Sequence, residues 1–335
     1  MRAIGQESRE VERGKLAILR VLSDSEGAAG SKVIARRLKN EYGIELSERA
    51  VRYHLRLLDE HGLTYKVSRR GGRAITQQGL DELENAMVAD NVGFVSDKIE
   101  LLAYQTSFDP DRRRGRVPIN ISLFPEERFK AALKAMAGAV SAGLGVSDLV
   151  AVASAGERLG GTLVPKGSIG LATVCSIISN GALLKAGVPM DSRFGGILQL
   201  HNQKLWRFTQ LIEYAGSSLD PSEIFITSRM TSITDVVKDG SGKILANFRE
   251  VPAMCLPVVE SVIEKLKGAA IDGLVTIGEP GKPVCEMPVG RNKVGVVLLG
   301  GLNPVAAAVE AGIDVTNKAM SSLIDFRLLR SFWEL

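Results

Sequence analysis

Hydrophobic positions recur at helical spacing in three stretches near the beginning of the chain. The apolar stripes fall within residues 11–22, 31–42 and 47–60, and spacing of i, i+3 and i+4 predicts amphipathic helices. Two short runs follow, Leu63–Val67 and Arg73–Thr76, around a glycine-containing turn. Glycine permits positive φ there, so these runs predict a β-hairpin. Three helices followed by a hairpin predict a winged helix-turn-helix.

The third predicted helix carries basic and hydrogen-bonding side chains opposite its apolar stripe. Ser47 is a candidate N-cap for this helix. Cations near the start of a recognition helix lie close to base edges and phosphates, and arginines in the wing project outward. The predicted contacts with double-stranded DNA are Ser47, Arg49, Arg52, Tyr53, Arg56, Arg69, Arg70 and Arg73. The alternative is a solvated helix followed by a charged loop.

The pattern changes near residue 86. Residues 76–86 predict a closing helix, and a further apolar-periodic stretch spans residues 93–108, followed by the basic turn FDPDRRRGR. We therefore predict a DNA-binding domain over 1–86, a connector over 87–116 and an effector-sensing domain over 117–335. The basic turn has two interpretations, a second DNA contact or a solvated, charge-rich linker.

The chain from residue 117 onward repeats its own pattern. Sliding it by 125 residues without a gap superposes Gly170 on Gly295 and Ala182 on Ala307. Each copy reads apolar strand, loop, apolar strand, then a small-residue helix ended by glycine. Chance is the alternative to duplication. Duplication predicts an α/β domain of two lobes, with repeat halves at 122–200 and 247–325, and a cleft between lobes is a usual ligand site. The overall class is α+β.

Helix starts that directly follow strands supply the candidate ligand groups of this domain. Asn303 is a candidate N-cap with Pro304 as the first helical residue, and Ser179-Asn180 take the same place in the first half. Backbone N–H groups at such ends suit a carboxylate or a phosphate. The candidate effector contacts are Thr173, Cys175, Ser176, Ser179, Asn180 and Arg193. The alternative role of these residues is to cap helices and pack loops.

Charge is distributed unevenly along the chain. The formal net charge is +4, but residues 1–80 hold 16 Lys and Arg against 10 Asp and Glu, and the remainder holds 26 against 28. The basic surplus therefore belongs to the N-terminal domain, as phosphate binding requires. No apolar run approaches the roughly 20 residues that cross a bilayer, and no hydrophobic signal region begins the chain. We expect a cytoplasmic protein with no membrane contact.

Motifs for catalysis or metal binding are missing from the sequence. The three cysteines, Cys175, Cys255 and Cys285, show no metal-ligand spacing. There is no GxSxG, P-loop, HExxH or GxGxxG motif after a strand. We therefore predict no enzyme activity, no cofactor and no metal. The alternative class is an enzyme or nucleotide-binding regulator whose winged helix contacts RNA or protein.

Three blocks, SERAVRYHLRLLDEHGL, SDKIELLAYQTSFDP and KGSIGLATVCSIISNGALLKAGVPMDSRFGGILQL, resemble the NrpR family of archaeal nitrogen-regulatory repressors. The resemblance runs from about Leu16 to Leu335, and the block from Gly170 to Leu200 is its most specific part. It implies a repressor that binds operators of nitrogen-assimilation genes and releases them when 2-oxoglutarate occupies the effector domain. A similar dicarboxylate would need the same cation, N–H groups and hydroxyls.

Some members of this family carry two winged domains and two effector domains in one chain, whereas this sequence has one of each. A single winged domain reads one half-site. The resemblance therefore implies a homo-oligomer, at least a dimer, on a palindromic operator. It leaves open the operator sequence, the target genes and the protein co-regulators.

Overall fold

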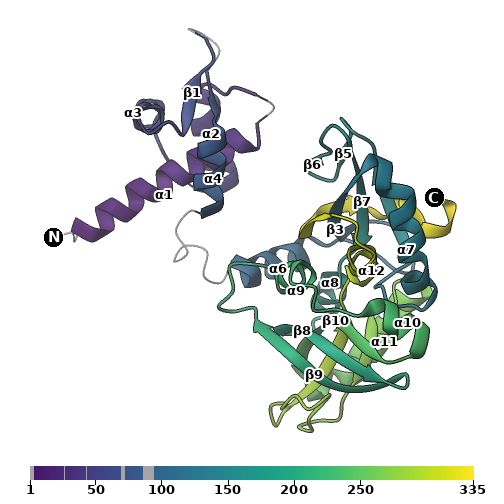
Figure 1. The fold of residues 1–335 in the computed structure, drawn as a ribbon. Coiled ribbons are helices and arrows are strands. Elements are labelled where there is room, and N and C mark those ends of the chain that lie inside the picture. The colour runs from purple at the N-terminus through teal and green to yellow at the C-terminus, as the bar shows by residue number, and fades with distance from the viewer. Residues whose placement is uncertain (1–3, 26, 43, 69–71, 86–93) are drawn as a thin grey trace. The chain divides into compact units, whose positions relative to one another are not determined.

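The computed structural model describes residues 4–25, 27–42, 44–68, 72–85 and 94–335 (Figure 1). The chain forms two compact units, Met1–Asn91 and Val92–Leu335. We call them the head and the body. Arg69 and Arg70, two of the predicted DNA contacts, lie outside the described residues.

The head is the predicted winged helix. Its elements are α1 (Ile4–Ser23), α2 (Ser31–Tyr42), α3 (Glu48–Glu60), β1 (Thr64–Lys66), β2 (Arg73–Ile75) and α4 (Gln77–Asn85). Apolar side chains of the first three helices meet in one core, including Ile18, Leu38 and Leu55. The wing is joined to the α1–α2 loop where Ala29 and Arg73 exchange backbone hydrogen bonds of 2.9 and 3.0 Å.

The body contains two successive series of elements. The first consists of α6 (Phe94–Gln105), β3 (Arg116–Pro125), α7 (Phe129–Ser141), β4 (Leu149–Ala153), β5 (Arg158–Leu159), β6 (Thr162–Leu163), β7 (Ser168–Val174), α8 (Ile177–Lys185), β8 (Asp191–His201), β9 (Lys204–Glu213), α9 (Pro221–Thr227) and α10 (Ile233–Asp239). The second consists of β10 (Gly242–Pro252), α11 (Leu256–Gly268), β11 (Leu274–Ile277), β12 (Lys293–Leu299), α12 (Asn303–Glu310), β13 (Thr316–Asp325) and β14 (Arg330–Ser331). Short 3₁₀ turns lie at 126–128, 253–255, 326–328 and 332–334.

Element order repeats between the two series. The run β3, α7, β4, β7, α8, β8 recurs as β10, α11, β11, β12, α12, β13. Strands β7 and β12 begin at residues 168 and 293, which are 125 apart. The β5–β6 hairpin of the first series lies where the second series has a loop with an isolated bridge between Val284 and Met287.

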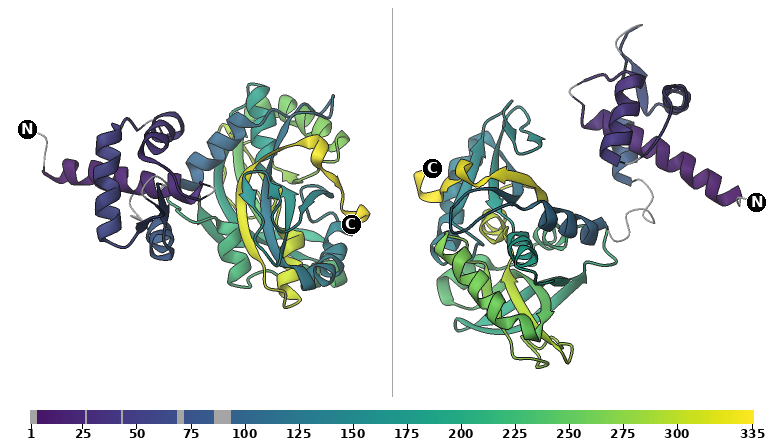
Figure 2. Two further views of the ribbon diagram at one scale, coloured as in Figure 1. Left: turned by 90° about the horizontal axis from the view of Figure 1, so that it is seen from above. Right: turned by 180° about the vertical axis from the view of Figure 1, so that it is seen from behind.

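The two sheets of the body do not coincide with the two halves of the sequence. One has the order β13-β3-β7-β4-β14 and the other β11-β12-β10-β8-β9. The strand that ends each repeated run therefore pairs with the first strand of the other run: β13 with β3, and β8 with β10. Figure 2 shows β13, in yellow, beside the teal strands of the first half. This exchange ties the halves together through backbone hydrogen bonds.

Helices α8 and α12 lie at the centre of the body, between the sheets (Figure 1). Both are short and consist mostly of apolar and small residues, a composition that favours burial on most sides. Residues 303–308 of α12 are all buried, as are residues 177–181 of α8.

The predicted starts of these two helices are wrong. α8 begins at Ile177, so Ser179 and Asn180 lie inside its first turn and do not cap it. α12 begins at Asn303 with Leu302 as its N-cap. The Asn303 amide instead binds β10, accepting from the Leu245 N–H at 2.7 Å and donating to the Leu245 carbonyl at 3.0 Å. Its side chain is used to join the helix to the sheet.

Candidate functional site

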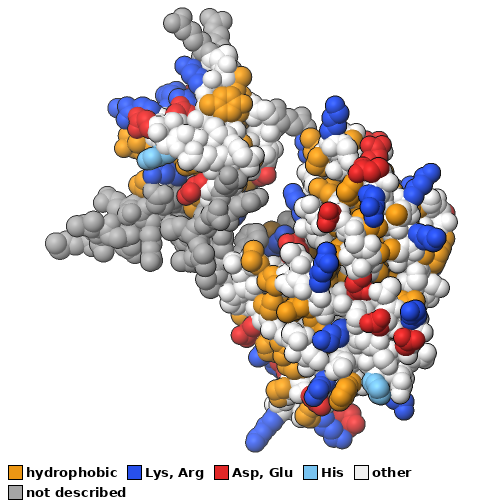
Figure 3. Space-filling view, in the orientation of Figure 1, with side chains coloured by type: hydrophobic (Ala, Val, Ile, Leu, Met, Phe, Trp, Pro, Cys, Tyr) orange, Lys and Arg blue, Asp and Glu red, His pale blue; other side chains and the backbone are white. Residues whose placement is uncertain are grey.

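Helix α3 presents the predicted polar face. Ser47 caps the helix by accepting a hydrogen bond of 3.2 Å from the Ala50 N–H, so its side chain sets where α3 begins. Arg49, Arg52, Tyr53 and Arg56 are all exposed, and Figure 3 shows Lys and Arg side chains gathered around α3. Apolar residues of the opposite face are buried in the head.

Most of these cations have neighbours within the head. Arg52 Nη1 lies 2.7 Å from Glu48 Oε1, and the Arg56 guanidinium stands 5.6 Å from the centre of the Tyr53 ring. Because these groups are exposed, such contacts cost little to exchange for phosphate. Arg73 differs, since its Nε donates to Asp59 Oδ2 at 2.7 Å and both side chains are partly buried. Arg73 therefore holds the wing against α3.

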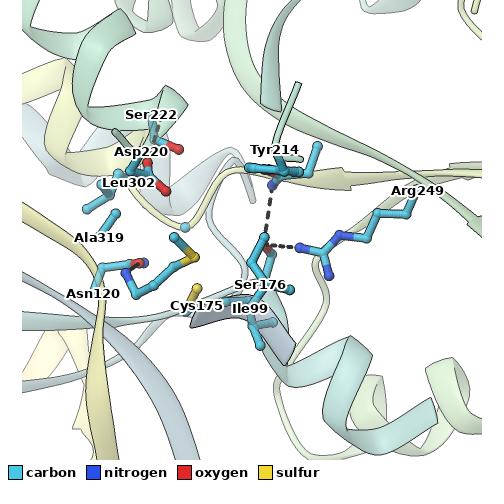
Figure 4. Close-up of a pocket in the computed structure, with 14 residues that line it drawn as sticks. Ile99, Asn120, Cys175, Ser176, Tyr214, Asp220, Ser222, Arg249, Leu302 and Ala319 are labelled. Carbon is cyan, nitrogen blue, oxygen red and sulfur yellow. Dashed lines mark hydrogen bonds between the residues drawn. The ribbon is translucent and has the colours of Figure 1, made fainter. Parts of the chain in front are cut away.

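A small cavity lies in the body where the two halves meet (Figure 4). Its volume is about 20 Å³, which is room for about one water molecule. Its walls come from α6, from the ends of β7 and β12, and from β3, β10, α9 and β13. The polar and ionisable side chains that line it are Asn120, Cys175, Ser176, Tyr214, Asp220, Ser222, Asn247 and Arg249.

The cation of this cavity is Arg249 on β10. It is 1% exposed, and its Nη2 donates to Ser176 Oγ at 3.0 Å. Nη1 lies 3.9 Å from the Met190 sulfur, and Nε has no partner among the described residues. Burial lowers the pKa of Arg249, but a guanidinium stays charged in proteins. None of the ion pairs of the described residues includes it, so the cavity can stabilise an anion.

Two asparagines occupy corresponding strand positions around the cavity. Asn120 on β3 and Asn247 on β10 are both buried. Asn120 Oδ1 accepts from the Met320 N–H at 3.0 Å. Asn247 Nδ2 donates to Ser176 Oγ at 3.2 Å, and its Oδ1 accepts from the Tyr214 hydroxyl at 2.5 Å. The two amides thus fix the walls that the two halves contribute.

Burial also shifts the pKa values of the other ionisable groups in the cavity wall. It raises the pKa of Cys175 to about 11, so this thiol is protonated at neutral pH. Burial likewise raises the pKa of Tyr214 and the pKa of Asp220. Asp220 Oδ1 accepts from the N–H groups of Ser222 and Glu223, at 2.8 and 3.3 Å, and so caps α9.

A larger groove of about 680 Å³ lies between α6 and α8. Ile99 lines both the groove and the cavity. Met190, which also lines the groove, contacts Arg249. A path from the groove to the cavity therefore requires these two apolar side chains to move.

The predicted effector residues lie in different environments. Cys175 and Ser176 line the cavity. Thr173 lies beside it on β7, within 3.4 Å of Asn120 Nδ2. Ser179 is buried within α8, and Asn180 lines the groove, where its Nδ2 donates to Ser192 Oγ at 3.1 Å.

Arg193, the predicted cation, does not line the cavity. Its Nη1 lies 3.5 Å from Glu250 Oε2 and 3.6 Å from Asp191 Oδ2, and its side chain is 39% exposed. Glu250 is itself buried and also binds Lys293 at 2.9 Å. Arg193 therefore belongs to a surface ion-pair group.

Sequence reasoning missed Arg249, Asn120 and Asn247. A signal for the asparagines was present, because INISLFP and ANFREVP superpose Asn120 on Asn247 and Pro125 on Pro252. That superposition needs an offset of 127 residues, which the ungapped comparison at 125 does not contain.

Within the described ranges, no group of His, Cys, Asp and Glu side chains is arranged to bind a metal ion. The helices described there are all too short or too polar to cross a bilayer.

Comparison with protein families gives two matches. Residues 92–331 match the family described as NrpR regulatory domains NRD1 and 2. Residues 16–83 match the ribonuclease R winged-helix domain.

Curated relatives extend these matches over nearly the whole chain. It is 37% identical over 321 residues to the global nitrogen regulator NrpRI of Methanosarcina mazei, covering 96% of this chain and 98% of the relative. It is 31% identical to the global nitrogen regulator NrpR of Methanococcus maripaludis and 33% identical to that of Methanocaldococcus jannaschii, covering 92% and 94% of this chain. The chain spans about half the length of these two relatives, 53% and 54%.

A solved structure is also similar. The chain resembles a nitrogen repressor-like protein from Methanococcus jannaschii, with a TM-score of 0.60 and 29% sequence identity. The match covers 71% of this chain and 98% of that one.

Proposed function

The chain belongs to the NrpR family of nitrogen regulators, and from that membership we propose that it represses nitrogen-assimilation genes and is released from operator DNA by 2-oxoglutarate. All three curated relatives are named as regulators and none as an enzyme. A repressor acts on genomic DNA, so we propose that the protein is located in the cytoplasm.

The head supports the DNA-binding part of this proposal. Arg49, Arg52 and Arg56 extend from the exposed face of α3, whose opposite face is fixed in the core. Tyr53 adds a hydrogen-bonding ring to the same face. This is the arrangement by which a recognition helix enters a major groove.

The observation that carries the effector part is the buried guanidinium of Arg249. A buried charge without an ionic partner is costly, and a bound carboxylate removes that cost. 2-Oxoglutarate supplies two carboxylates, and Ser176 and Asn247 are further groups that can bind one of them. Cys175 would then line the same site as a neutral thiol.

Binding would require the cavity to open. A volume of about 20 Å³ is too small for a five-carbon dicarboxylate, because even one water occupies a comparable space. Ile99 forms part of the wall and lies on α6, the first described helix after the head in the sequence. We propose that the ligand displaces α6 and in this way alters operator binding by the head.

We further propose that the protein acts as a homodimer. One winged helix reads one half-site, so a palindromic operator requires two heads spaced by about one helical turn or a multiple of it. Effector binding would change that spacing. A coupling free energy of about 1–3 kcal/mol would weaken operator binding roughly 5- to 150-fold.

The test is a fluorescence-anisotropy titration of the full chain with its own upstream promoter DNA, with and without millimolar 2-oxoglutarate. We expect tight, salt-sensitive binding that the dicarboxylate weakens. Tight operator binding with the same affinity in the presence and absence of 2-oxoglutarate would show that 2-oxoglutarate is not the effector. Absence of DNA binding in both conditions would overturn the repressor function.

The match of residues 16–83 to a ribonuclease winged helix keeps a second role for the head open, that of an RNA contact. The same titration with an RNA of the promoter-proximal sequence separates the two. Preference for duplex DNA supports the repressor, and preference for RNA contradicts it.

A further inference from the structure

We propose that Asp220 takes up a proton when a dicarboxylate binds in this cavity. The affinity for the effector therefore falls as pH rises. The inference rests on the proposed function, because it assumes that a dicarboxylate occupies the cavity beside Arg249.

The argument begins with the charges that line the cavity. Arg249 is the only Lys or Arg among the described residues that line it, and Asp220 is the only Asp or Glu. Figure 4 shows the two on opposite sides, with Ser176 between them. One carboxylate of the ligand can face Arg249. The other then meets no Lys or Arg in the described cavity wall and lies towards Asp220.

Two ionised carboxylates cannot share a partly buried site cheaply, because like charges raise the pKa of one of them. A protonated Asp220 has the opposite effect, since its O–H can donate to the ligand. Burial already raises the pKa of Asp220 in the ligand-free protein. An added negative charge raises it further, so the complex binds a proton.

The position of Asp220 allows it to be protonated without loss of structure. Both backbone N–H groups that it caps, those of Ser222 and Glu223, donate to the same oxygen, Oδ1. A proton on Oδ2 therefore leaves these two bonds in place. Helix α9 keeps its N-cap in either protonation state.

Other ionisable groups around Asp220 do not replace it as the proton acceptor. Those that act on it or share its surroundings are Lys98, Glu223, Tyr214, Cys175, Arg249 and Lys318. Burial raises the pKa of Glu223, but its carboxylate accepts from the Ala319 N–H at 2.6 Å and does not line the cavity. The thiol and the phenol stay neutral at physiological pH because burial raises the pKa of each.

The experiment is titration calorimetry of the full chain with 2-oxoglutarate in two buffers of different ionisation enthalpy, between about pH 6 and 8. The difference in heat gives the number of protons taken up. Between the pKa of Asp220 in the free protein and its higher pKa in the complex, we expect uptake approaching about one proton per site and affinity that falls up to about tenfold per pH unit. The ligand itself does not titrate in this range.

Asp220→Asn is the variant that tests the assignment. Asparagine keeps an oxygen that caps α9 but does not titrate, so proton uptake and the pH dependence of affinity should both disappear. Glu223→Gln is the matched control, a neighbouring acid outside the cavity wall, and it should behave as the native chain does.

Binding without proton uptake in the native chain overturns this inference and leaves the proposed function standing. Uptake that persists in Asp220→Asn also overturns it. Absence of 2-oxoglutarate binding at every pH instead contradicts the proposed function. The native chain in two buffers decides the proton uptake even if Asp220→Asn does not fold.

Discussion

Arg249 Nη2 donates to Ser176 Oγ at 3.0 Å, across the junction between the two halves of the body. Arg249 lies on the first strand of the second half, and Ser176 lies between β7 and α8 of the first half. The exchange of strands β8 and β13 brings these positions together. The hydroxyl also accepts from Asn247 Nδ2 at 3.2 Å, so Ser176 is shared by two groups of β10.

Replacing Arg249 separates effector binding from stability. We expect Arg249→Met to lose the response to 2-oxoglutarate, because hydrogen bonds to a charged group are worth about 1.5–3 kcal/mol, roughly tenfold or more in affinity. Operator binding should persist. Thermal stability should be unchanged or higher, since an apolar side chain of similar length removes a buried charge. Anisotropy titrations and thermal unfolding measure the two effects.

Arg193→Met is the matched control for that substitution. Arg193 is also an arginine of the body, but it pairs with Asp191 and Glu250 and does not line the cavity. We expect this variant to keep its response to the effector. A lost response in Arg193→Met together with an intact response in Arg249→Met would assign the ligand to the arginine that the sequence predicted.

The head should respond to a different substitution. Arg52→Ala should weaken operator binding at all sequences alike if it contacts phosphate, and lower the slope of log K against log salt by about one. The response to 2-oxoglutarate of the remaining binding should be unchanged. Arg128→Ala, an exposed arginine of the body, is the control. An equal loss in both variants would show that only overall charge matters.

Local sequence patterns predicted the head because its structure depends on neighbours in the sequence. The Ser47 cap, the burial of Val51, Leu55 and Leu58, and the hairpin all follow from spacing within about fifteen residues. Gly72 is also constrained by a residue far from it in the sequence. It adopts φ +77°, and a Cβ there would lie 2.4 Å from the Ala29 carbonyl oxygen.

The cavity could not be predicted in this way, because it depends on pairing between distant strands. In the sequence NFREVP, Arg249 is next to Glu250, and two adjacent charged residues indicate an exposed strand. Both are buried, because β10 lies in the middle of its sheet between β12 and β8. The sequence predicted repeated halves. Nothing in the sequence of either half indicates that β8 pairs with β10 or that β13 pairs with β3.

Cysteine reactivity reports on the closed state of the cavity. Burial raises the pKa of Cys175 to about 11, so on the order of one thiol in a thousand is ionised at pH 8. Cys255 and Cys285 are partly exposed. We expect iodoacetamide to modify Cys255 first and Cys175 last in the folded chain, as measured by mass spectrometry of peptides. Rapid labelling of Cys175 without denaturant would show that the cavity is open in the free protein.

The close approach of α6 and α8 gives the last prediction. A Cβ on Gly181 would lie 2.5 Å from Thr106 Cβ and 2.9 Å from the Ala103 carbonyl oxygen. Gly181→Ala must therefore push α6 away from α8, and overpacking of this kind costs about 1–3 kcal/mol. At about 2–4 °C per kcal/mol for a unit of this size, calorimetry should show a clearly lower melting temperature.

Gly268→Ala is the control, because the last residue of α11 has no atom within 4 Å of its added Cβ, and its melting temperature should change little. Since Ile99 on α6 lines the cavity, a displaced α6 should also open it. We therefore expect Gly181→Ala to label faster at Cys175 than the native chain does. A destabilised variant with unchanged Cys175 labelling would show that α6 does not close the cavity.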